Sequence, residues 1–360
     1  MKKHNTNIFA ISTPSQMMNA MEFIHHFSIH GENNIVIITC NSQNFIKQIK
    51  EIGSSFKLVF YVLFSPQLAF VKPRLFNVMP LKLIKLYVSK RRIYKKLKTE
   101  QVDRLILGNY SNFMSQYCTQ IVTSEMYILD DGTGSILVAK KRVIEIKDGI
   151  PIFDFNYKRK ALWLVKLLMG FFSYKITSKF TFFSSYKLDI SDHDNIISND
   201  YNYLKNFYSS QDIGSKSEYF IGSPISEVGY VTEDVEIELI LNYANHIKDT
   251  NLVYIPHRLD SKRKISQIEE SIKVLHFELP IEFVLTQNTA LPKKMSGFFT
   301  SALPNLAQIM NENVLFSALR IPNHFFLTEN MKNRATQVYE TFNTIDRIEV
   351  INHNSYEGNN

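Results

Sequence analysis

Short apolar runs alternate with helical stretches along the first part of the chain. The runs that fit buried strands cover residues 7–12, 34–40, 56–63, 103–108 and 126–130. Residues 13–27 and 44–52 carry apolar side chains at helical spacing, and the first of these begins with the capping sequence TPS. Continuous apolar strands separated by helices are typical of a parallel sheet covered on both faces. We therefore expect residues 1–200 to form a Rossmann-like α/β domain.

The same alternation starts again after residue 215. Strands are expected over residues 218–224, 251–258, 280–285 and 313–321, a strand, turn and helix over 295–310, and a helix over 333–343. Thr232, followed by acidic residues, predicts a capped helix over 232–247. The sequence thus predicts a second Rossmann-like domain over 215–345 and a polar tail over 346–360. Two doubly wound domains would bind ligands in a cleft between the carboxyl ends of their sheets.

Composition suits a globular protein of two domains. The chain has 360 residues, of which 45% are hydrophobic and 21% charged. The two cysteines, Cys40 and Cys118, form no CxxC motif, which fits a reducing compartment and argues against a structural zinc. No signal-peptide pattern is seen, and the most apolar segment, 161–172, is too short to span a bilayer and contains Lys166. We expect a cytoplasmic protein.

Much of the formal net charge of +7 lies in the segment Lys82–Lys98, which has many lysines and arginines and no acidic residue. Interleaved apolar residues give it the pattern of a basic amphipathic helix. Such a helix presents either an ordinary solvated face or a binding surface for anionic lipid head groups or an acidic polymer. The sequence has no aromatic platform or recognised nucleic-acid module, so no nucleic-acid role is expected.

Small polar groups follow four of the predicted strands. They are Asp130-Asp131-Gly132, Gly222-Ser223-Pro224, Pro256-His257-Arg258 and Thr300-Ser301. Taken singly, each also fits a structural role, as a turn, a hydrogen-bonded loop residue or a helix cap. The carboxyl ends of parallel strands lie on the same side of a sheet. The four groups together therefore indicate a functional site at the carboxyl ends of the strands in each domain.

In their order along the chain, these groups resemble the motifs of bacterial sialyltransferases of the GT-B type, which include lipooligosaccharide sialyltransferases and capsule polysialyltransferases. Those families share a D/E-D/E-G motif, then an HP-type motif, then a Ser/Thr pair. Here the HP-type dipeptide is reversed, as Pro256-His257. The opening TPSQMMNAMEF, with Ser15, is similar to the first strand–loop–helix of the family, whose polar loop faces the donor. The resemblance covers most of the chain as scattered short motifs.

The resemblance implies an inverting transferase with the GT-B fold that takes sialic acid from CMP-Neu5Ac without a metal or other cofactor. Such a reaction needs a carboxylate that accepts the proton of the acceptor hydroxyl. Asp130 is expected to be this base and Asp131 to orient it, although the residues themselves leave open which of the two is the base. His257 is expected to stabilise the phosphate of the CMP leaving group. The expected substrate-binding residues are Ser15, Gly132, Gly222, Ser223, Pro256, Arg258, Glu278, Thr300 and Ser301.

One sequence feature would favour a metal-dependent reaction, the DxD triplet Asp192-His193-Asp194. It lies in an irregular segment and ends no predicted strand, so we interpret it as a polar loop. The leaving group, a phosphate monoester, does not require a divalent ion. We therefore expect no metal site.

The expected acceptor is a terminal sugar, such as a galactoside, on a bacterial O-antigen, lipooligosaccharide or capsule intermediate. Because such acceptors are lipid-linked, the Lys82–Lys98 segment, and with it Trp163 and its aromatic neighbours Phe171 and Phe172, could contact the inner membrane surface. Two other functions stay open: a GT-B enzyme that uses another nucleotide sugar, and a non-catalytic glycan-assembly protein with the same fold.

Overall fold

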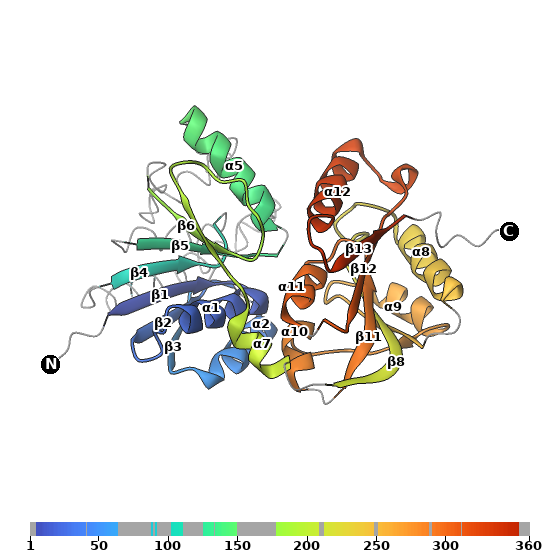
Figure 1. Cartoon of the computed structure of the whole chain (residues 1–360), viewed down its shortest axis with the longest axis horizontal. Coiled ribbons are helices and arrows are strands. Elements are labelled where there is room, and N and C mark those ends of the chain that lie inside the picture. Colours follow the sequence, from blue (N-terminus) through green and yellow to red (C-terminus); the bar gives the residue numbers. More distant parts are fainter. Residues whose placement is uncertain are drawn as a thin grey trace. The chain divides into compact units, whose positions relative to one another are not determined.

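The computed structural model describes residues 5–40, 42–63, 88, 91, 102–110, 125–132, 134–149, 178–208, 212–247, 251–287, 290–310 and 312–352. The chain divides into two compact units, Met1–Tyr203 and Leu204–Asn360 (Figure 1). Each unit is built around one parallel sheet.

The first unit has a seven-stranded sheet with the order β3-β2-β1-β4-β5-β6-β7. Its strands are β1 (Thr6–Ile11), β2 (Asn33–Ile38), β3 (Leu58–Val62), β4 (Val102–Leu107), β5 (Glu125–Leu129), β6 (Thr181–Ser184) and β7 (Asn195–Ser198). Every neighbouring pair is parallel. Its helices include α1 (Pro14–His26), α2 (Gln43–Ile52), the 3-10 turn η1 (Gly53–Ser55) and α5 (Gly134–Asp148).

Continuous apolar sequence accounts for the centre of this sheet. Every residue of β1 is buried, and Ile8 and Ala10 join apolar residues of β2 and β4 in one core. Thr13 begins α1 as expected, because its hydroxyl accepts a hydrogen bond from the Gln16 backbone N–H (3.3 Å) and Pro14 occupies the first helical turn. The first residues of α1 are thereby fixed at the carboxyl end of β1.

The second unit has a six-stranded parallel sheet with the order β10-β9-β8-β11-β12-β13. Its strands are β8 (Asp212–Ile221), β9 (Leu252–Ile255), β10 (Lys273–Val274), β11 (Ala290–Gly297), β12 (Leu315–Leu319) and β13 (Ile348–Ile351). Its helices include α8 (Glu233–His246), α9 (Lys262–Glu269), α10 (Ile281–Val284), α11 (Ala302–Ile309) and α12 (Glu329–Phe342), with the 3-10 turns η4 (Leu285–Gln287) and η5 (Asn323–Phe325); α7 (Asn202–Tyr208) spans the boundary between the units. This strand order is that of a doubly wound Rossmann fold.

One predicted strand is wrong. Residues 280–285 form the short helix α10 and the start of η4, whereas the strand of this region is β11. Pro280 precedes the helix, and its carbonyl accepts hydrogen bonds from Phe283 N and Val284 N. A short apolar run fits a buried helix turn as well as a strand, so its hydropathy did not distinguish the two.

Two segments singled out in the sequence lie outside the described residues. They are 161–172, with Trp163 and Phe171 and Phe172, and all of Lys82–Lys98 apart from Val88 and Arg91. The membrane contact expected of them stays a prediction. Among the helices of the described residues, none is long and apolar enough to cross a membrane.

Candidate functional site

The carboxylates of Asp130 and Asp131 lie at the carboxyl end of β5 and contact different parts of the first unit. Asp130 is 2% exposed and faces the end of β6. Its Oδ1 accepts a hydrogen bond from Ser184 Oγ (2.6 Å), and its Oδ2 accepts from Ser185 N (2.7 Å) and Ser185 Oγ (3.2 Å). Burial raises the pKa of Asp130 to about 6, although these hydrogen bonds act in the opposite direction. Asp130 is thus an enclosed group with its oxygens already occupied.

Asp131 is half-buried, and its carboxylate contacts α1 and the loop after β4. Its Oδ1 accepts a hydrogen bond from the Gln16 side-chain amide (2.7 Å), and its Oδ2 accepts from the Asn109 side-chain amide (2.6 Å). Its backbone N–H donates to Ser135 Oγ (2.8 Å) in the first turn of α5. Gly132 follows with a φ of 61°, a left-handed conformation that glycine adopts without strain. The turn therefore fixes the Asp131 carboxylate between α1 and the loop after β4.

A small cavity of about 250 Å³ opens beside Asp131. Its walls come from the ends of β4 and β5 and from α5, and they include Asn109, Tyr110, Leu137, Val138 and Lys141. The cavity combines apolar walls with one carboxylate and one lysine, the mixture expected of a site for a polar organic ligand. Of the two carboxylates in the motif, Asp131 is the one that lines it.

Of the DxD triplet, Asp194 belongs to a buried structural network, whereas Asp192 and His193 are exposed. Asp194 accepts hydrogen bonds from Arg142 Nε (3.0 Å) and from Phe180 N (3.1 Å). Arg142, which is fully buried in α5, also forms an ion pair with Glu145 (3.0 Å). The Glu145 carboxylate in turn accepts from the Tyr110 hydroxyl (3.0 Å). The acidic residue Asp194 therefore neutralises a buried arginine.

In the second unit, two glycines allow neighbouring strand ends to approach closely. A Cβ atom on Gly222, after β8, would lie 2.9 Å from His257 N and 2.7 Å from the Tyr254 hydroxyl. A Cβ on Gly297, at the end of β11, would lie 2.7 Å from Ile221 O and 3.3 Å from Thr300 Cγ2. The carboxyl ends of β8, β9 and β11 thus bring together Gly222, His257 and Thr300, as the sequence predicts for one sheet edge.

The turn that carries His257 is held by buried charges. Asp260 Oδ2 accepts hydrogen bonds from His257 N (2.9 Å) and the Tyr254 hydroxyl (2.7 Å), while Asp260 Oδ1 pairs with Lys264 Nζ (2.8 Å). His257 Nδ1 accepts a hydrogen bond from Leu259 N (3.2 Å). The other ring nitrogen, Nε2, takes no part in this contact. Burial, with the nearby cations Arg258 and Lys264, lowers the pKa of His257 to about 4. The imidazole is therefore neutral at pH 7.

Lys264 lies at the centre of a carboxylate cluster. Its ammonium group is within 3.0 Å of Glu227, within 2.9 Å of Glu236 and within 2.8 Å of Asp260. These three acids form the one group among the described residues whose oxygens are spaced to hold a metal ion. Since the lysine side chain already supplies a cation at that position, we interpret the cluster as structural. Burial raises the pKa of Glu236 to about 7.

The remaining predicted binding residues differ in their accessibility. Ser223 is buried, and its hydroxyl has no hydrogen-bond partner, an uncommon state for a buried polar group. Thr300 and Ser301 are half-buried immediately before α11, and Ala302 N donates to Thr300 Oγ1 (3.4 Å). Glu278 is exposed in the loop between β10 and α10. The other predicted positions are Ser15, half-buried in the first turn of α1, Pro256, half-buried after β9, and Arg258, which is exposed.

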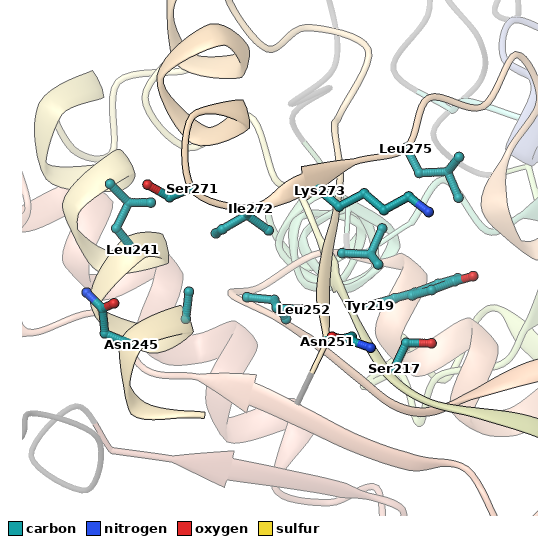
Figure 2. Close-up of a pocket in the computed structure, with 12 residues that line it drawn as sticks. Ser217, Tyr219, Leu241, Asn245, Asn251, Leu252, Ser271, Ile272, Lys273 and Leu275 are labelled. Atoms are coloured by element: carbon teal, nitrogen blue, oxygen red, sulfur yellow. The ribbon is translucent and has the colours of Figure 1, made fainter. Parts of the chain in front are cut away.

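Another cavity of the second unit lies at the amino ends of the strands β9 and β10 (Figure 2). It measures about 780 Å³ and is lined by the beginnings of β9 and β10, part of β8 and the last turns of α8. Tyr219, Asn245 and Lys273 line this cavity, and none of the predicted binding residues does. In open α/β sheets, ligands bind at the carboxyl ends of the strands, so this cavity is not the candidate donor site.

Sequence reasoning missed the partners of the two aspartates. Gln16, Asn109, Ser184 and Ser185 each lie at the carboxyl end of a strand or in the helical turn that follows one. The rule that identified Asp130-Asp131, polar residues directly after an apolar run, also applies to Asn109 after LILG and to Ser184 and Ser185 after TFF.

No family model and no curated protein matches this sequence. Solved structures do match nearly the whole chain. A UDP-glucosyltransferase from Polygonum tinctorium is 11% identical, with a TM-score of 0.51 and coverage of 97% of this chain and 86% of that one. Os79 from O. sativa, solved with UDP, is 8% identical, with a TM-score of 0.50 and coverage of 95% and 91%. The GT-B domain of a sialyltransferase from Photobacterium damselae is 11% identical, with a TM-score of 0.45 and coverage of 96% and 99%. The chain therefore has the GT-B fold that the sequence predicts.

Proposed function

We propose that this chain is an inverting, metal-independent sialyltransferase that moves sialic acid from CMP-Neu5Ac to a terminal sugar, such as a galactoside, of a bacterial surface glycan. The GT-B fold, the Asp130-Asp131-Gly132 turn and the order of the polar groups after the strands support this proposal. One observation carries it: the Asp131 carboxylate lines a cavity and is oriented by two amide donors.

We assign the role of general base to Asp131 rather than Asp130. As the acceptor hydroxyl oxygen bonds to the anomeric carbon of the sugar, its proton passes to the Asp131 carboxylate and the bond to the CMP phosphate breaks. Asp130 is enclosed and its oxygens accept hydrogen bonds from Ser184 and Ser185, so it has little access to an acceptor. Its role is to hold the end of β6 against the turn that presents Asp131.

The second unit would bind the donor. Gly222 lets a nucleotide approach the backbone at the end of β8. The buried Ser223 hydroxyl beside it has no hydrogen-bond partner. The leaving CMP phosphate gains negative charge, which a hydrogen bond from the neutral His257 imidazole and the backbone N–H groups at the start of α11 can stabilise. The phosphate-monoester leaving group makes a metal unnecessary, and the acidic cluster of this unit already surrounds Lys264.

The test is to follow CMP release from CMP-Neu5Ac with a galactoside acceptor in the presence of EDTA. Asp131→Asn should lower the turnover rate by about 10²–10⁴-fold, because it removes the base but keeps the shape of the side chain. Asp148→Asn, which changes an exposed carboxylate at the end of α5, is the matched control and should keep wild-type turnover. Equal turnover by Asp131→Asn and wild type would contradict the assignment of the base.

The donor is tested separately from the fold. Consumption of a UDP- or GDP-sugar, with no release of CMP, would assign the enzyme to another nucleotide sugar. Turnover that requires added metal would contradict the metal-independent mechanism. Absence of turnover with every donor and acceptor, together with glycan binding that Asp131→Asn retains, would favour a non-catalytic glycan-assembly protein.

A further inference from the structure

The two oxygens of the Asp131 carboxylate are held by amides from two different elements. Gln16, from the first turn of α1, donates to Oδ1 at 2.7 Å, and Asn109, from the loop after β4, donates to Oδ2 at 2.6 Å. Neither residue belongs to the motif that identified the site. Each carboxylate oxygen thus has its own amide donor, so rotation of the carboxylate would break both contacts.

The orientation of the Gln16 amide is fixed by a second contact. Its Oε1 accepts a hydrogen bond from Ser12 N at 2.7 Å, so its Nε2 must be the atom that faces Asp131. The side chain is fully buried, and a Cβ atom on Gly108 would lie 2.5 Å from its Oε1. The absence of a side chain at position 108 therefore makes room for the Gln16 amide.

We propose that Gln16 and Asn109 are positioning residues for the base, which hold the Asp131 carboxylate in one orientation and in its ionised form. This inference rests on the proposed function. An amide N–H binds an ionised carboxylate oxygen more strongly than it binds the hydroxyl oxygen of a neutral carboxyl group. Protonation of Asp131 on either oxygen would therefore weaken one of the two contacts.

Among the described residues that line the cavity, Lys141 of α5 is the one charged residue besides Asp131. Tyr110 of the loop after β4 lines the cavity too, with its hydroxyl bonded to Glu145. Asp130 precedes Asp131 but faces β6. The neutral Gln16 of α1 contacts Asp131, so its replacement by an acid changes the local charge directly.

The decisive variant is Gln16→Glu. It keeps the shape of the side chain and the acceptor for Ser12 N, but it places a second carboxylate about 2.7 Å from Asp131. Two carboxyl groups at that distance share a proton, so we expect the acid limb of the kcat/KM profile against pH to move up by about one pH unit or more. Asn109→Asp makes the same change at the other oxygen, from a half-buried position, and serves if Gln16→Glu folds poorly.

Asn7→Asp is the matched control. The Asn7 amide donates to Glu32 Oε2 at 2.8 Å, so this variant also puts an acid beside a carboxylate, at the beginning of β1 and away from the cavity. It should leave the acid limb where it is in wild type. An acid limb that moves in Asn7→Asp as far as in Gln16→Glu would overturn the inference, because the shift would then be a general effect of charge.

An NMR titration measures the effect of Gln16 on Asp131 without substrate, so its result does not depend on the proposed function. In protein labelled with ¹³C at aspartate carboxyl carbons, the Asp131 signal is assigned by its loss in Asp131→Asn. Gln16→Glu should raise the midpoint of that signal by about one pH unit or more without any substrate. An unchanged midpoint would overturn the inference even if the protein is an active transferase. A raised midpoint in a protein that transfers no sugar would support the amide contacts and reject the proposed function.

Discussion

Burial raises the pKa of the Asp130 carboxyl group, and hydrogen bonding lowers it. The dependence of stability on pH shows which of the two effects is larger. Its carboxylate accepts hydrogen bonds from Ser184 and Ser185, which favour the ionised form, but it is only 2% exposed. Burial dominates and raises the pKa of Asp130 to about 6, from an ordinary value of 3.8. A difference of about two pKa units corresponds to about 3 kcal/mol.

The sign follows from the order of the two pKa values. Below the unfolded value, Asp130 is protonated in both states and contributes nothing that depends on pH. As the pH rises toward about 6, the unfolded chain loses the proton while the folded chain keeps it. Above that value the folded protein holds a buried charge. The contribution of this group to the unfolding free energy therefore falls by about 3 kcal/mol across this window.

The assay is urea unfolding of wild type and Asp130→Asn, followed by far-UV circular dichroism between about pH 4 and pH 7. All other titrating groups are common to both proteins, so the difference curve isolates Asp130. We expect the stability of wild type relative to the variant to decrease as the pH rises. A difference that grows with pH would refute the reasoning, because it would mean that the hydrogen bonds lower the pKa of Asp130.

The buried ion cluster and the glycine after β8 give two more predictions. Lys264→Met leaves three carboxylates around an apolar side chain and should lower the unfolding free energy by about 3–5 kcal/mol in urea denaturation. Lys332→Ala breaks an exposed ion pair and should cost less than about 1 kcal/mol. Gly222→Ala brings a methyl group within 2.7 Å of a buried tyrosine hydroxyl, so it should lower the Tm and weaken CMP binding in calorimetry. Gly31→Ala, with no atom within 4 Å of the new methyl group, should do neither.

For two of these variants, Lys264→Met and Gly222→Ala, a specific result would contradict the prediction. Wild-type stability in Lys264→Met would mean that the three carboxylates relax or take up protons without cost. Normal CMP binding in Gly222→Ala, with a Tm like that of Gly31→Ala, would mean that the end of β8 does not approach the nucleotide.

Hydropathy predicted the central strands well because their apolar runs are continuous. The fully buried strand β1 and the capped helices after Thr13 and Thr232 follow from local sequence. The outer strands β6 and β7 were missed because they are four residues long, and β7 is largely exposed, so neither has a distinctive pattern. Residues 280–285 were misassigned because a short apolar run lacks the length that separates helix from strand.

The candidate site was predictable only in part. Adjacent acids after an apolar run identified Asp130 and Asp131, but the sequence held no information on which one is enclosed. That difference depends on Ser184, which is 54 residues away, and on Gln16, which is 115 residues away. Contacts over such separations are set by the strand order, and hydropathy along a single chain does not specify that order.

The strand order also affects how the protein folds during synthesis. The central strand β1 pairs with β2 on one side, and its other edge is complete only when β4, Val102–Leu107, has left the ribosome. Until then an apolar strand has an unpaired edge, which is a site for wrong pairing with other chains. Each sheet, however, takes all its strands from one continuous part of the chain, with β7 ending at Ser198 and β8 beginning at Asp212. The first sheet can therefore be complete before any strand of the second has left the ribosome.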